Sequence, residues 1–251
     1  MPGVFLHANG LSPLPTEPYP ARPVRWLAYM ASRLLLKTIL AAVARTRILH
    51  RERSRLPGGC LLVANHISHF DPPFLGVAAL RKVDWMATRE LYEIAPLGWW
   101  MRAVDTFPVD REQVDRAAVR EALARLKRGR MVGVFPEGGI RDGAHSVLEG
   151  MPLKPGIAAL AHLSGAPVVP CVIIGSDQLY THRNWLPLRR AGAWIAFGEP
   201  LRFSGEGKIA RVEFEAHVAA AWRALFAELK ERFHLTADDL PQPPMRRKGR
   251  V

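Results

Sequence analysis

Short uninterrupted apolar runs along the middle of the chain predict β-strands that are buried on both faces. These runs lie at residues 60–64, 83–87, 131–135, 168–174 and 193–197. Apolar positions at helical spacing, and an Ala-rich segment after a Pro-Gly pair, predict helices between and after the runs. The helices lie at residues 74–80, 112–128, 154–164 and 209–233. Strands that alternate with helices predict an α/β fold with a mixed, largely parallel sheet covered by helices.

One longer helix is predicted before the first strand, at residues 25–49. It is apolar over most of its circumference, but Arg33 and Lys37 interrupt it, so no uncharged stretch reaches the ~18–20 residues of a spanning helix. Because the two cations are four residues apart, they share one face. We expect an amphipathic helix in a membrane interface, with its cations towards lipid phosphates. The alternative is a helix packed on the protein's own core, with two snorkelling cations.

The composition separates the two ends of the chain from a central folded domain. Residues 1–24 are rich in proline and residues 236–251 contain a basic run, so both ends are predicted to be disordered. Residues 50–235 are long enough for one folded domain with a full core. Cys60 and Cys171 both lie in apolar runs, which indicates small core residues in a reducing compartment.

The charge balance points to an anionic partner. The chain has 35 Lys+Arg against 23 Asp+Glu, which gives a formal net charge of +12. Such an excess suits nucleic acid, an anionic membrane surface or a phosphorylated substrate. Aromatic and basic residues are not interleaved as in a single-strand binder, and no DNA-binding module appears, so nucleic acid is not expected.

Candidate chemistry lies directly after the first predicted strand, where His66 stands five positions before Asp71. An aspartate that folds back onto one imidazole nitrogen leaves the other nitrogen free as a general base. A metal site from His66, His69 and Asp71 is the rival interpretation, but no second cluster of ligands follows with suitable spacing, so no metal is expected. A nucleophilic Ser68 lacks the Gly-x-Ser-x-Gly pattern of a nucleophile elbow.

Two arginines and a glutamate follow other predicted strands. Arg111 and Arg141 each come after an apolar segment and a proline, and together they would form a clamp for phosphate. The alternative for either arginine alone is a surface salt bridge. Glu137 stands between a proline and Gly138, where the backbone can come close to a ligand.

Four blocks of the sequence resemble a known family. They are Asn65-His66 through Asp71, Phe107 through Arg111, Phe135 through Gly138, and Ala166 through Pro170. Their order and spacing resemble those of the glycerolipid acyltransferases, most closely the bacterial 1-acyl-sn-glycerol-3-phosphate acyltransferases. The resemblance covers about residues 60–175 and implies that residues 50–235 form an acyltransferase domain.

The resemblance also implies roles for the matching residues. His66 would be the general base and Asp71 the group that orients its imidazole. The residues that would bind the acceptor and its phosphate are Phe107, Arg111, Glu137, Gly138 and Arg141. Arg141 departs from the family pattern, because it stands four residues after the glutamate instead of three.

The expected function is therefore acyl transfer from acyl-CoA or acyl carrier protein to the hydroxyl of lysophosphatidic acid, which gives phosphatidic acid in phospholipid biosynthesis. The resemblance implies no cofactor and places the enzyme on the cytoplasmic face of the cell membrane, at an anionic bilayer surface. Another lyso-lipid or glycolipid acceptor is one alternative. The other is a non-catalytic basic protein that binds a lipid surface or nucleic acid.

Overall fold

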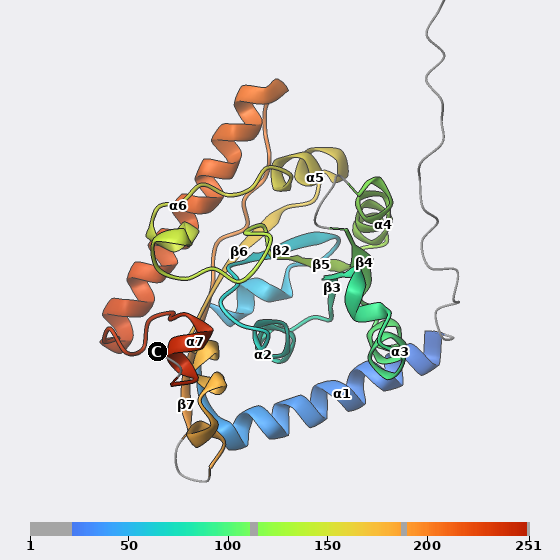
Figure 1. The fold of residues 1–251 in the computed structure, drawn as a ribbon. Coiled ribbons are helices and arrows are strands. Elements are labelled where there is room, and N and C mark those ends of the chain that lie inside the picture. Colours follow the sequence, from blue (N-terminus) through green and yellow to red (C-terminus); the bar gives the residue numbers. More distant parts are fainter. Residues whose placement is uncertain (1–21, 111–114, 187–189, 250–251) are drawn as a thin grey trace, which may run out of the picture.

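A seven-stranded mixed sheet forms the centre of the described chain (Figure 1). The computed structural model describes residues 22–110, 115–186 and 190–249. The strand order is β1-β7-β6-β2-β5-β3-β4. The strands are β1 (Ala44–Leu49), β2 (Cys60–Ala64), β3 (Val83–Thr88), β4 (Phe107–Val109), β5 (Met131–Val134), β6 (Val168–Ile174) and β7 (Ala191–Phe197).

Neighbouring strands are parallel except for β6 and β7, which are antiparallel. The central strand β2 pairs with β5 on one side and β6 on the other, with Leu61 opposite Val132 and Val168. This architecture confirms the predicted α/β fold, and all five predicted strands are present. The edge strands β1 and β4 were not predicted.

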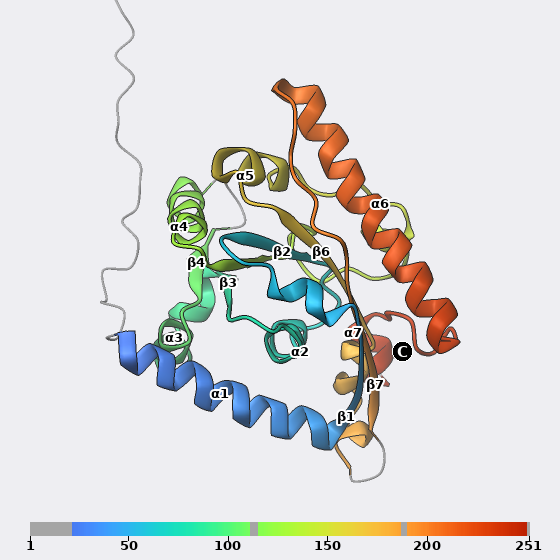
Figure 2. The same cartoon turned by 180° about the vertical axis from the view of Figure 1, so that it is seen from behind.

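Helices cover both faces of this sheet (Figures 1 and 2). Leu61 and Val63 of β2 point into a core shared with α4 (Arg116–Lys127), α5 (Ile157–Ser164) and α6 (Gly207–Phe233). The alternate residues Cys60 and Leu62 point into a core shared with α1 (Arg22–Val43) and α2 (Asp71–Ala78). α3 (Ala95–Ala103) lies beside α1 near its N-terminal end.

The long N-terminal helix is shorter than the sequence pattern predicts. α1 ends at Val43, and residues 44–49 form the strand β1, which pairs in register with β7. The helical prediction for residues 44–49 is therefore wrong, because pairing with a distant strand overrides the local pattern.

α1 presents an apolar face to the outside. By length and composition the helix could span a membrane, and only 11% of its most apolar 18-residue stretch is buried. The exposed apolar side chains are Val24, Trp26, Leu27, Met30, Leu34, Leu35 and Ile39. The predicted outward basic stripe is wrong for Arg33, whose guanidinium donates hydrogen bonds to the carbonyl oxygens of Val77 and Ala79 at 3.4 and 2.6 Å. These carbonyls end α2, so the cation satisfies groups that the helix leaves unpaired.

The C-terminal segment also differs from the expectation of a disordered tail. The structure describes the chain as far as residue 249 and includes a short helix, α7 (Pro244–Arg247). The Arg247 guanidinium donates to the buried Asp177 carboxylate at 2.6 Å, and this ion pair holds the segment against the domain. The basic run predicted disorder because composition alone does not reveal that one of its arginines binds the buried Asp177.

Candidate active site

The turn between β2 and α2 is held by side chains that pair with backbone. At the end of β2, the Asn65 side-chain amide donates to the Ile173 carbonyl oxygen at 2.9 Å and accepts from the Ile173 N–H at 2.8 Å. This pairing with β6 fixes the residue before His66. α2 then begins at Asp71 with prolines in its first turn, where a missing N–H costs nothing.

His66 and Asp71 form a hydrogen-bonded pair within this turn. The His66 Nδ1 and Asp71 Oδ2 atoms are 2.8 Å apart. The same oxygen accepts from the backbone N–H groups of Ile67 and Ser68 at 2.7 and 2.9 Å. Asp71 is fully buried, whereas His66 is slightly exposed and lines a cavity. A histidine that is bonded through Nδ1 to a carboxylate can take up a proton at Nε2.

Glu137 holds the same turn from the loop after β5. Its Oε2 accepts from the His66 backbone N–H at 2.8 Å, and its Oε1 accepts from Ser146 Oγ at 3.1 Å and from the Val147 N–H at 3.0 Å. Burial raises the pKa of the Glu137 carboxyl, and these donors oppose that shift. Because both oxygens already have protein partners, the geometry indicates that Glu137 positions the turn. The backbone N–H of Arg141 adds a further bond, to the His66 carbonyl oxygen at 2.8 Å.

Gly138 and Gly139 each lie next to one cationic side chain. Gly138 has φ +70°, and a Cβ at this position would lie 2.5 Å from Lys154 Nζ. A Cβ on the neighbouring Gly139 would lie 3.5 Å from the Arg141 guanidinium. A side chain at Gly138 would therefore displace a cation as well as strain the backbone. Arg111 lies outside the described residues.

Phe107 occupies a different place from the other predicted site residues. It is 1% exposed, belongs to the core beneath α4, and has the Arg125 guanidinium 4.7 Å from its ring centroid. It is not among the residues that line the cavity beside His66. The structure thus brings together His66, Asp71 and Glu137 and places Phe107 in the core.

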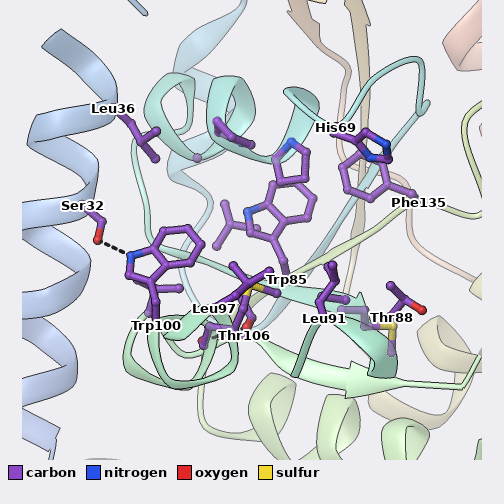
Figure 3. A pocket seen from close by; sticks show the side chains of 18 of the residues that line it. Ser32, Leu36, His69, Trp85, Thr88, Leu91, Leu97, Trp100, Thr106 and Phe135 are labelled. Carbon is purple, nitrogen blue, oxygen red and sulfur yellow. Dashed lines mark hydrogen bonds between the residues drawn. The ribbon is translucent and has the colours of Figure 1, made fainter. Parts of the chain in front are cut away.

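An apolar cavity of about 650 Å³ extends from His66 between α1, α2, α3 and β3 (Figure 3). The His66 ring stacks on Phe135 at a centroid distance of 4.3 Å, and Phe135 stacks on Trp85 at 4.9 Å. Farther along, Trp100 Nε1 donates to Ser32 Oγ at 2.9 Å and so joins α3 to α1. Other lining residues are Leu36, Pro72, Met86, Leu91, Leu97, Met101 and Val104. A cavity of this size and polarity suits a long apolar ligand.

Two buried serines near the pair were missed by the sequence reasoning. Ser176 donates through Oγ to Asp71 Oδ1, and Ser146 donates to Glu137. Ser176 follows the predicted strand 168–174, so its place at the edge of the sheet where the other site residues gather was an available signal. Ser146 follows no predicted element, and no local pattern marks it.

Comparisons with known proteins relate this chain to one family. Residues 45–174 match the family model described as Acyltransferase. A 1-acyl-sn-glycerol-3-phosphate acyltransferase of Bacillus subtilis (strain 168) is 27% identical over 200 residues, which cover 78% of this chain and 92% of that protein. A lyso-ornithine lipid O-acyltransferase of Pseudomonas aeruginosa is 30% identical over 202 residues, with coverage of 75% and 76%.

A solved structure also has this fold. The 1-acyl-sn-glycerophosphate acyltransferase of Thermotoga maritima superposes with a TM-score of 0.63 at 22% identity, and 82% of each chain is covered. The family match spans the turn with His66 and Asp71, the loop with Glu137 and strand β6. The chain belongs to the acyltransferase family.

Proposed function

We propose that this acyltransferase transfers an acyl group from acyl-CoA or acyl carrier protein to the free hydroxyl of lysophosphatidic acid, which yields phosphatidic acid. The observation that carries the proposal is the His66–Asp71 pair, 2.8 Å apart, at the wall of a large apolar cavity. The similarity to the acyltransferase of Bacillus subtilis supports the choice of acceptor.

In the proposed reaction, His66 acts as the general base. Its Nε2 removes the proton of the acceptor hydroxyl as the oxygen attacks the thioester carbonyl. The ionised Asp71 stabilises the imidazolium that forms and holds its tautomer. When the tetrahedral intermediate collapses, the C–S bond breaks and the thiolate takes the proton from His66. The proton balance closes without a covalent acyl-enzyme, a metal or a cofactor.

The apolar cavity is proposed to hold the acyl chain of the donor. Its wall is formed by aromatic and aliphatic side chains, including Trp85 and Trp100, and it has few polar groups. Arg111 and Arg141 are proposed to bind the acceptor phosphate, as the family resemblance implies. Gly138 would let the acceptor approach the backbone, and Phe107 would act indirectly by packing the strand that precedes Arg111.

The exposed apolar face of α1 is proposed to rest in an anionic bilayer, from which the lipid acceptor is drawn. Apolar side chains such as Trp26 and Leu34 are 59% and 67% exposed, and burying them in lipid is favourable. The net charge of +12 adds attraction to anionic lipid. We place the enzyme at the cytoplasmic face of the cell membrane.

A second acceptor class is favoured by one comparison. The lyso-ornithine lipid O-acyltransferase of Pseudomonas aeruginosa is similar over three quarters of this chain. A lyso-aminolipid would use the same base and the same cavity, so the two candidates differ only in how the acceptor headgroup is held.

The test is thiol release in mixed micelles from an acyl-CoA and an acyl carrier protein thioester, each with and without lysophosphatidic acid. We expect acceptor-dependent release that is lost in His66→Ala and kept in His217→Ala, an exposed histidine of α6. Arg111→Ala should raise the KM for lysophosphatidic acid, whereas Arg211→Ala should not. Release that survives in His66→Ala would overturn the mechanism. Release only with lyso-ornithine lipid would replace the proposed acceptor with the second one.

A further inference from the structure

A buried hydroxyl supports the carboxylate oxygen of Asp71 that faces away from the histidine. Ser176 is fully buried, and its Oγ donates to Asp71 Oδ1. Ser68 Oγ lies 3.2 Å from the same oxygen and 2.9 Å from Ser176 Oγ. The two hydroxyls therefore fix the plane of the carboxylate, while its Oδ2 contacts the His66 ring. A carboxylate in this position keeps its orientation only while its donors stay in place.

Ser176 owes its position to a sharp turn at the end of β6. Gly175 has φ +82°, and a Cβ there would lie 2.2 Å from the Gly192 carbonyl oxygen of β7. The chain then forms a 3₁₀ helix, Ser176–Tyr180, which lies beside the turn that carries His66 and Asp71. Tyr180 gives a second contact, because its hydroxyl accepts from the His69 backbone N–H at 3.1 Å.

The C-terminal segment contacts this 3₁₀ helix near both of its ends. The Arg247 guanidinium donates to Asp177 Oδ2 at 2.6 Å, and the Gln242 N–H donates to the same oxygen at 3.1 Å. Just after the end of the 3₁₀ helix, Thr181 Oγ1 donates to the Arg247 carbonyl oxygen at 2.7 Å. The ammonium of Lys248 lies 5.3 Å from the centroid of the Tyr180 ring.

The Arg247–Asp177 ion pair among these contacts is costly to break. Asp177 is fully buried and the Arg247 side chain is 12% exposed. Removal of the arginine would leave a buried carboxylate without its main counter-ion, and such a group must either move or take up a proton. Either change occurs one residue from Ser176.

From these contacts we propose that Ser176 is a positioning residue for the His66–Asp71 pair, and that α7 holds Ser176 in place through the Arg247–Asp177 ion pair. The inference rests on the proposed acyl transfer, since its readout is the turnover of that reaction. The C-terminal segment thereby acts on the chemical step although it supplies no group to the cavity.

The test compares Arg247→Ala with Arg246→Ala in the full chain, using the thiol-release assay at saturating donor and acceptor. Arg246 is the matched control, because it is an exposed arginine on the same short helix. We expect kcat to fall roughly tenfold in Arg247→Ala, the size of one hydrogen bond to a charged group, with both KM values unchanged. Arg247→Lys, which keeps the charge, should restore most of the loss, and Arg246→Ala should match the parent chain.

A double-mutant cycle with Ser176→Ala tests whether the ion pair acts through the serine. Ser176→Ala alone should lower kcat about as much as Arg247→Ala, and the double variant should lose little more than either single one. Losses that simply multiply would overturn the proposed path, and so would an unchanged kcat in Arg247→Ala. Unfolding would also lower kcat, because it reduces the fraction of active enzyme. A circular dichroism melting curve is therefore recorded for every variant, Arg247→Lys included, to separate the two causes. If the parent chain releases no thiol with any acceptor, the proposed function itself fails.

Discussion

Replacing Asp71 by asparagine would remove the charge behind His66 and leave the shape of the site unchanged. In the parent chain, Asp71 Oδ2 accepts from His66 Nδ1 and from two rigid backbone N–H groups, so the asparagine must present its oxygen there. Its amide group then faces the hydroxyls of Ser68 and Ser176, which can rotate to accept. Asp71→Asn should therefore fold normally.

The expected loss of activity follows from the distance within the pair. Opposite charges 2.8 Å apart, as on protonated His66 and Asp71, attract by about 6 kcal/mol at an effective dielectric constant of about 20. At about 1.4 kcal/mol for each tenfold change in rate, complete loss corresponds to about 10⁴-fold. The asparagine oxygen still accepts from the ring, which restores part of the energy. We therefore expect kcat to fall by about 10³- to 10⁴-fold.

The assay is thiol release at saturating donor and lysophosphatidic acid, with KM values and a melting curve recorded for each variant. Both KM values should change little, because Asp71 touches neither substrate. Asp71→Ala is the comparison. It also leaves the Ile67 and Ser68 N–H groups without an acceptor, so it should lower the melting temperature. A kcat loss of less than about tenfold in a folded Asp71→Asn would refute the charge-based account of the pair.

Three further predictions concern the cavity, helix α1 and the buried Asp177 of the Arg247–Asp177 ion pair. Trp100→Ala should open the cavity where the indole meets Ser32 and move the kcat/KM profile towards longer acyl donors, measured across a series of chain lengths; an unchanged profile would contradict this placement of the chain. The double substitution Leu34→Ser and Leu35→Ser should weaken co-sedimentation with anionic vesicles by roughly tenfold or more without changing the melting curve, since each exposed leucine loses the gain of burial in lipid. Burial raises the pKa of Asp177 to about 6, so the folded state takes up a proton that the unfolded state does not bind until about pH 4. In urea titrations, the parent chain should therefore gain stability relative to Asp177→Asn as the pH falls from about 6 to 4. A stability difference that stays constant over this range would contradict the raised pKa.

The five predicted strands were recognisable because each is buried on both faces. Runs such as Cys60–Ala64 and Val168–Ile174 have no exposed residue, so their continuous apolar pattern is visible without knowledge of the partners. The edge strands do not have this property. β1 exposes three of its six residues and continues directly from α1, and β4 is only three residues long and contains a proline.

The hydrophobic pattern also could not predict which face of the N-terminal helix packs against the domain. Arg33 and Lys37 share a face by spacing alone, but spacing does not say which face meets the domain. In the structure Arg33 turns inwards to the end of α2, and the apolar side chains remain outside. The outcome depends on unpaired carbonyl oxygens in another helix, which no local window contains.

The sequence by itself determined the α/β class, the buried strands and the pair His66–Asp71, because these depend on neighbours within a few residues. Tertiary structure decided what surrounds the pair. Glu137 and Ser176, far from the turn in sequence, complete its hydrogen bonds. Folding also moved Phe107 into the core and brought the C-terminal Arg247 beside the site. The physical reason is that a buried polar group must find a partner, and the chain supplies it from whichever segment the packing of the sheet brings within reach.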